Sequence, residues 1–159
     1  MDKNQVLIDY LISCPSIKNN PLFFNFIEAK DNATQLVITG NEKSLDKPYI
    51  DGSVEKLYTF TIIDYKSVVY QAVVKLPGYT NENVSDLMDV QGIIDWITEQ
   101  NNLKNFPNFG NKCEVEEIKA MTSNPTLNGV DTAVSPGLAK YSISIQIKYL
   151  DKTGVIWNS

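Results

Sequence analysis

The sequence predicts an α+β fold in which helices cover a sheet, within a single domain over residues 1–159. Residues 139–150 alternate apolar and polar side chains, which is typical of a strand with one buried face. Residues 56–65 carry β-branched and aromatic side chains on both faces, which favours a central strand. Residues 85–102 repeat apolar side chains at helical spacing, which predicts a long helix lying across that sheet.

The N-terminal part is predicted to hold a helix and two short strands. Apolar side chains recur at helical spacing over about residues 3–13, and the apolar face of this helix could pack on the core or dock on a neighbouring subunit. Residues 22–28 and 35–39 are predicted as strands separated by a polar turn. A hairpin elaboration is therefore expected at about residues 22–48.

Two further segments are rich in residues that favour strands. Residues 67–74 could form another strand or a short helix, and their β-branched content favours the strand. Residues 113–121 are predicted as a strand whose alternation slips between Glu116 and Glu117, as a β-bulge would cause.

The long helix carries its own start signals. Asn83 or Ser85 is expected to cap it, and Asp86 and Asp89 are expected in its first turn, where carboxylates favour the helix dipole. The same two carboxylates could instead bind a metal ion. Gly92 costs about 1 kcal/mol relative to alanine inside a helix, which predicts a close approach to another backbone.

The remaining segments are predicted as connectors. Residues 105–111 are rich in turn-forming residues, and their two phenylalanines are expected to be anchored. Residues 122–137 have no periodicity and are predicted as a long polar loop, a feature that is usually functional or disordered. Residues 155–157 form an apolar tail that could be tied down on the sheet or on a partner.

Composition restricts the chemistry that the chain can offer. The net charge is −5, all fourteen basic residues are lysines, and histidine is absent, so the usual general base and the arginine fork for phosphate are both missing. Specific nucleic acid binding is therefore not expected. Cys14 and Cys113 are expected to be free thiols in a reducing compartment, with a disulfide as the alternative.

No catalytic motif is recognisable, so the chain is predicted not to be an enzyme and to need no cofactor or metal. Glu114, Glu116 and Glu117 could supply an acid or a cation site, although a solvated strand face is the commoner arrangement. The N-terminal residues lack the continuous apolar run of a signal peptide. No segment has the ~18–20 apolar residues that span a bilayer, so no membrane partner is expected.

From the long helix onward, the chain resembles the small minor capsid or tail terminator proteins of tailed bacteriophages. The resemblance lies in the order and spacing of short motifs, none of which is a catalytic signature. The matching residues are Asp95-Trp96-Ile97 and Gln100, then 105–110, 124–131, 138–141 and 149–151.

This resemblance implies a fold and a role. The fold would be a mostly antiparallel sheet covered by helices, and the subunits would form a ring, usually a hexamer, at the head-proximal end of the tail tube. The implied partners are the chain itself, the tail tube protein and a head-completion or connector protein. The implied location is the tail–neck region of the virion, with the host cytoplasm during assembly. A cytoplasmic protein-binding module of unknown partner and a small enzyme remain as alternatives.

Two segments are predicted as subunit or partner contacts, because they carry family-like residues without apolar periodicity. They are the connector at residues 106–112 and the loop at residues 123–137. The predicted interface residues are Phe106, Phe109, Lys112, Leu127, Val130 and Asp131.

Overall fold

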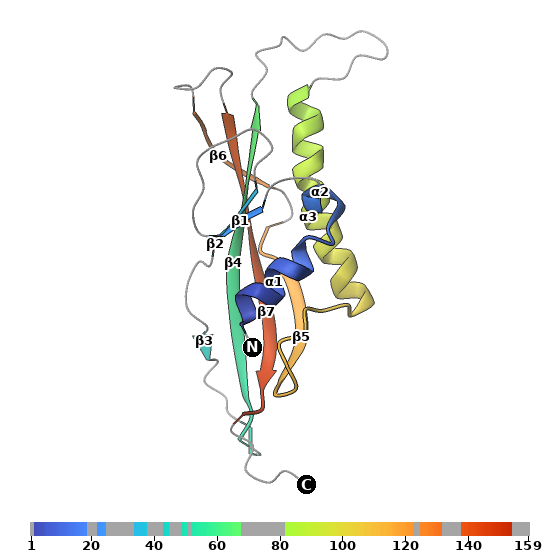
Figure 1. Ribbon diagram of the computed structural model, residues 1–159, viewed down its shortest axis with the longest axis vertical. Coiled ribbons are helices and arrows are strands. Elements are labelled where there is room, and N and C mark those ends of the chain that lie inside the picture. Colours follow the sequence, from blue (N-terminus) through green and yellow to red (C-terminus); the bar gives the residue numbers. More distant parts are fainter. Residues whose placement is uncertain are drawn as a thin grey trace.

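Two long antiparallel strands form the centre of the sheet, β4 (Val54–Ser67) and β7 (Leu138–Asp151). They pair along their whole length and extend along the long, vertical axis of the molecule in Figure 1. This computed structural model describes residues 2–18, 22–24, 34–37, 43–44, 49–50, 52–67, 82–122, 125–131 and 138–153. The strands predicted at residues 56–65 and 139–150 are confirmed.

The described elements form one seven-stranded sheet with helices beside it, in the order β1-β2-β4-β7-β5. In addition, β3 pairs with β4, and β6 pairs with β7. Only β1 and β2 are parallel, so the sheet is mostly antiparallel and the α+β class is confirmed. The other elements are α1 (Lys3–Leu11), α2 (Pro15–Lys18), β1 (Leu22–Phe24), β2 (Thr34–Val37), β3 (Lys43–Ser44), α3 (Glu82–Leu103), β5 (Cys113–Ala120) and β6 (Thr126–Asp131).

The three helices of the described residues pack on one face of the sheet, where their hydrophobic core lies (Figure 1). The alternation of β7 directs one set of side chains into this core, as its sequence predicts. Each of these buried side chains contributes about 1.5–3 kcal/mol relative to an exposed one. The buried side chains come from β7 (Ile143, Ile145, Ile147, Tyr149), β4 (Tyr58, Phe60, Ile62), α3 (Val90, Ile93, Ile94, Ile97) and α1 (Leu7, Leu11).

The face of β7 away from the helices is polar, whereas the same face of β4 also carries Leu57, Ile63 and Tyr65. Ser144 and Lys148 of β7 lie on this face, and Thr61 of β4 pairs directly with Ser144. The hydroxyl oxygens of Thr61 and Ser144 are 3.3 Å apart. The sheet therefore has one apolar face under the helices and an opposite face that is polar along β7 and mixed along β4.

The predicted N-terminal helix is confirmed as α1. Asp2 caps it, because its carboxylate accepts a hydrogen bond from the Asn4 backbone N–H at 2.9 Å. The hydroxyl of Tyr58 donates to Asn4 Oδ1, which ties the helix to β4. Pro15 then begins α2. The backbone N–H groups of the first helical turn have no partner within the helix, so a proline, which has no N–H, loses no hydrogen bond there.

The long helix is confirmed as α3, but its predicted start is wrong. The helix begins at Glu82, so Asn83 and Ser85 lie inside it and do not cap it. Asparagine and serine cost less than about 1 kcal/mol relative to alanine inside a helix. A residue that could cap a helix is therefore a weak predictor of where the helix begins. Asp89 lies about two turns into the helix rather than in its first turn, and the side chain of Asp86 lies outside the described residues.

Gly92 of α3 makes a close approach, although to a side chain rather than to a backbone. A Cβ built on Gly92 would lie 2.7 Å from the hydroxyl of Ser16 on α2. The absence of a side chain at this position therefore lets α2 pack directly against α3.

Two pairing predictions are wrong. β1 and β2 are parallel, so they do not form a β-hairpin, which requires antiparallel strands. Residues 126–131 form the strand β6 rather than part of a long loop, because they pair with the edge of β7. The bulge predicted in β5 is confirmed, since the register shifts between Val115 and Glu117.

Several predicted segments lie outside the described residues. They are the strand at 67–74 beyond Ser67, the apolar tail at 155–157, and most of the 22–48 region apart from its three short strands.

Candidate functional site

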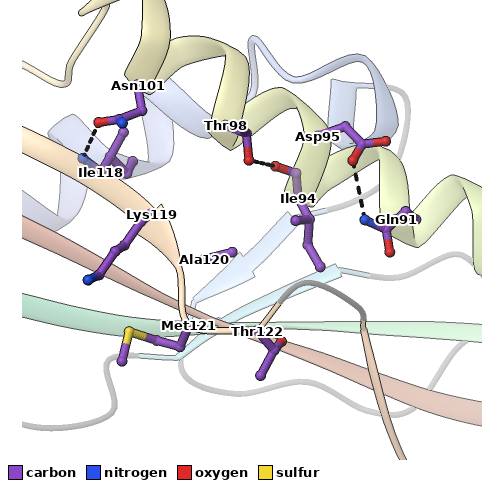
Figure 2. A pocket seen from close by; sticks show the side chains of 10 residues that line it. All are labelled: Gln91, Ile94, Asp95, Thr98, Asn101, Ile118, Lys119, Ala120, Met121 and Thr122. Carbon is purple, nitrogen blue, oxygen red and sulfur yellow. Dashed lines mark hydrogen bonds between the residues drawn. The ribbon is translucent and has the colours of Figure 1, made fainter.

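A groove of about 450 Å³ lies between α3 and the C-terminal end of β5 (Figure 2). The helix contributes Gln91, Ile94, Asp95, Thr98 and Asn101, and the strand and the two residues after it contribute Ile118, Lys119, Ala120, Met121 and Thr122. Figure 2 shows the side chains of the helix and those of the strand on the two sides of the groove. Its volume falls in the range of protein ligand sites, about 300–1,000 Å³.

The helix side of the groove is polar and internally bonded. The amide of Gln91 donates to the carboxylate of Asp95 at 3.2 Å, and the hydroxyl of Thr98 donates to the Ile94 carbonyl at 3.1 Å. These side chains form a stripe because residues three and four apart share one helix face. Ile94 and Ile118 are buried and give the groove an apolar floor.

One backbone contact links the helix to the edge of β5. The backbone N–H of Ile118 donates to Asn101 Oδ1 at 3.1 Å, so this N–H points away from β7. The N–H of Met121 donates to the Ser144 carbonyl of β7 at 2.8 Å. Because backbone groups alternate in direction along an antiparallel strand, the N–H and C=O of Ala120 point to the same outer side as those of Ile118.

The β5 strand is therefore an edge strand beside a helix. Within the described ranges, β5 pairs with β7 alone. Asn101 occupies the outer side of β5 at Ile118, and the backbone of Ala120 faces the groove. Such an edge is a template for another extended segment.

A group of charged side chains lies on the polar face of the sheet, near the bulge of β5. Burial raises the pKa of Glu116, and the negative charge of nearby Glu55 raises it further. Lys148 Nζ lies 3.4 Å from Glu55 Oε1, and this hydrogen bond raises the pKa of the lysine. The described part of the chain contains no group of three His, Cys, Asp or Glu side chains able to hold a metal ion.

A second charged cluster joins β4 to α3, and its Asp89 side chain is 44% exposed. Lys66 Nζ lies 2.8 Å from Asp89 Oδ2 and 3.9 Å from Asp64 Oδ2, and both Lys66 and Asp64 are almost fully buried. The interpretations of Asp89 as a metal ligand or as a helix-dipole carboxylate are replaced by this ion pair. Cys14 lies near the cluster, and burial raises the pKa of its thiol, which makes it a poor nucleophile. Both cysteines are free, as predicted.

The predicted contact residues of the connector divide between core and surface. Phe109 is only 4% exposed and packs its ring against those of Tyr58 and Tyr149, with centroids 5.7 and 5.5 Å away. Phe106 is half-buried against the same core, which confirms that both phenylalanines are anchored. Lys112 is exposed, and its carbonyl accepts the Lys152 N–H at 2.7 Å. The buried ring of Phe109 therefore offers no surface to a partner.

The second predicted contact segment lies at the other end of β7. Leu127 is 54% exposed on β6, while Val130 and Asp131 are on the same strand with side chains outside the described residues. β6 pairs with residues 138–142 of β7, whereas β5 begins opposite Asp151. The two segments are therefore about 30 Å apart along the strand and do not form one patch.

Residues 95–97, 100 and 105–110 build the corner between α3 and β5. Asn105 donates from its side chain to Gln100 Oε1 at 2.6 Å and from its backbone to the Gln100 carbonyl at 2.9 Å. The hydroxyl of Tyr10 donates to the Asn105 carbonyl at 2.8 Å, and its ring packs on Trp96. Gly110 has a φ of 103°, a conformation that favours glycine.

The groove is a feature that the sequence reading missed. Its signal was present, because Gln91, Asp95, Thr98 and Asn101 form a polar stripe beside the apolar face of the helix. Nothing in that stripe distinguishes a groove wall from an ordinary solvated helix face. Only the pairing of β5 with β7 places its outer edge opposite this stripe.

In the part of the chain that the structure describes, fold and groove together define an α+β domain in which the outer edge of β5 pairs with no further strand and lies beside α3. No known protein family matches this chain, and no curated protein matches it as a relative. Across the described ranges, none of the helices is long and apolar enough to cross a membrane.

Proposed function

We propose that this chain is a structural protein of a bacteriophage tail, a subunit of a ring at the head-proximal end of the tail tube. In this role it terminates polymerisation of the tube and joins the tail to the head. Its partners are copies of itself, the tail tube protein and a head-completion or connector protein.

The observation that carries the proposal is the corner between α3 and β5. Asp95–Ile97, Gln100 and residues 105–110 carry the resemblance, and the contacts of Gln100 and Asn105 fix how α3 meets the sheet. Residues that set such a geometry are those that two proteins of the same fold would share. The mostly antiparallel sheet with helices on one face agrees with the fold that the resemblance implies.

The distribution of charge also supports a passive channel. A ring through which DNA passes must not retain it, and the chain has a net charge of −5 with no arginine. On the polar sheet face, Lys148 lies beside Glu55 rather than in a cationic patch. Such a surface offers few counterion-releasing contacts to phosphate.

The groove favours a second candidate, a protein-binding module. An open strand edge beside a helix is a recurring arrangement for recognition of extended peptides. This candidate differs from the first in assembly, because a binding module has no need to form a closed ring.

The experiment that separates them measures mass and assembly together. The purified chain is examined by light scattering and electron microscopy, alone and with polymerising tail tube protein. We expect closed rings of one size, and tubes whose growth stops when the chain is added. A chain that stays monomeric at every concentration and leaves tube growth unchanged would contradict the proposal.

A further inference from the structure

We infer that the groove between α3 and β5 holds residues 154–159 of a second copy, added as a strand to the outer edge of β5. The inference rests on the proposed function and names the contact that would join neighbouring copies.

The hydrogen-bonding groups of the groove are suited to bind an extended backbone. The N–H and C=O of Ala120 face it, and Asn101 Oδ1 already occupies the place of a strand carbonyl at the Ile118 N–H. An added segment would continue the ladder from the point where the side chain of Asn101 ends. Main-chain hydrogen bonds of this kind give affinity, while the side-chain contacts give specificity.

The apolar floor of the groove is suited to bind a segment with apolar side chains. Ile94 and Ile118 form its floor, and Ala120 leaves space above them because its side chain is small. Residues 155–157 are Val-Ile-Trp, which are strong strand formers. In an extended segment, Val155 and Trp157 share one face, so both could contact the floor.

The segment cannot fill the groove of its own chain. It follows Thr153, which lies at the beginning of β5 because the Lys152 N–H donates to the Lys112 carbonyl. The groove lies at the other end of β5, a strand of 8 residues that is about 25 Å long. Six extended residues reach at most about 20 Å, so the occupant must come from another copy.

A contact of this kind joins two different places on the chain. The donor end of one copy meets the acceptor groove of the next, which makes the interface heterologous. Heterologous contacts produce rings when the rotation closes, and filaments when it does not. The inferred contact is therefore of the type that a ring of identical subunits needs.

The test cross-links two full-length variants through introduced cysteines. One carries Thr122→Cys in the groove and the other carries Trp157→Cys, both in a Cys113→Ser background that removes the half-buried native thiol, and they are mixed and treated with a short bismaleimide. We expect a covalent dimer in the mixture and none with either variant alone. The matched control is Glu99→Cys, which is exposed on α3 but does not line the groove.

A backbone variant tests the strand addition itself. Ala120→Pro removes only an N–H that points away from β7, and proline is tolerated on edge strands. We expect this variant to keep its thermal midpoint within a few degrees and to lose the cross-link in the Thr122→Cys background. If the proline variant unfolds, Ala120→Trp, which fills the groove from its side chain, replaces it with the same expected loss.

The outcomes separate this inference from the proposed function. Rings without the cross-link, or equal cross-linking at Thr122→Cys and Glu99→Cys, overturn the inference and leave the ring proposal standing. A cross-link that survives both groove variants also overturns the inference. A chain that is monomeric at every concentration overturns both.

Discussion

Asp151 links the end of β7 to the start of β4 through charged contacts. Its Oδ2 lies 2.8 Å from Lys56 Nζ, and the Thr153 backbone N–H and hydroxyl donate to Oδ1 at 2.9 and 2.7 Å. Burial opposes ionisation of this carboxyl, but the hydrogen bonds from Lys56 and Thr153 outweigh it. Together they lower the pKa from 3.8 to about 2.

This shift predicts how stability depends on pH. A depressed pKa means that the contribution of Asp151 is fully present above about pH 4 and is lost as the pH falls to about 2. After allowance for solvent screening, the contribution is on the order of 1 kcal/mol. We expect Asp151→Asn to unfold at lower urea at neutral pH and to equal the wild type near pH 2. An equal deficit at both pH values would contradict the ion-pair account.

At the level of residues, the sequence distinguishes buried from exposed positions only within helices and strands whose apolar side chains recur periodically. The buried face of β7 follows from alternation alone. Phe109 has no such pattern around it, because its connector is irregular, and its burial depends on Tyr58 and Tyr149, which are distant in sequence. Lys66 is buried for a similar reason, since Asp89 comes from another element.

At the level of elements, Gly92 determines how closely α2 packs on α3. A Cβ at this position would lie 2.7 Å from Ser16 Oγ but 4.0 Å from Ser16 Cβ. Alanine should therefore be unfavourable only while the Ser16 hydroxyl is present.

A double-mutant cycle tests this packing. We expect Gly92→Ala to destabilise the wild type, because the hydroxyl must move. In a Ser16→Ala background the same change should stabilise the protein by about 1 kcal/mol, the usual gain of alanine over glycine in a helix. Urea unfolding of the four proteins measures the coupling. The same effect in both backgrounds would show that the two helices are not in contact at this point.

The elements that the sequence predicted are those whose signal is local. The periods of α1, α3, β4, β5 and β7 are each contained in their own residues. The parallel pairing of β1 with β2, and the strand β6 within a stretch rich in Thr, Asn, Gly and Asp, depend on partners far along the chain. The strand preference of a residue depends on its surroundings, so pairing with β7 can stabilise a strand whose residues do not favour one.

At the level of the whole molecule, the predicted contact segments lie at opposite ends of β7. A subunit that contacts neighbours at both ends could bridge two layers of an assembly, whereas a single patch could not. Of the three predicted contact residues in the connector, Lys112 is the exposed one, since Phe109 is buried in the core and Phe106 is half-buried. The surface of β6 is thus the more accessible candidate for an apolar contact.

The last prediction concerns that surface. Leu127 is 54% exposed, and Val130 lies on the same strand, which is held to β7 by its backbone ladder. Replacing both residues with serine leaves that ladder intact, so we expect the thermal midpoint of the isolated chain to change by only a few degrees. If β6 contacts a neighbour, the double variant should lose ring assembly in light scattering and leave tubes of uncontrolled length.

The matched control is Leu103→Ser at the end of α3, where the side chain is 67% exposed, and it should assemble normally. Scattered exposed leucines are common on protein surfaces and need no partner. Loss of assembly in the β6 variant with retention in the control would therefore assign the effect to position rather than to a general loss of apolar surface. Normal rings from a folded β6 variant would instead show that this strand makes no contact between copies, and the connector near Lys112 would remain as the predicted contact.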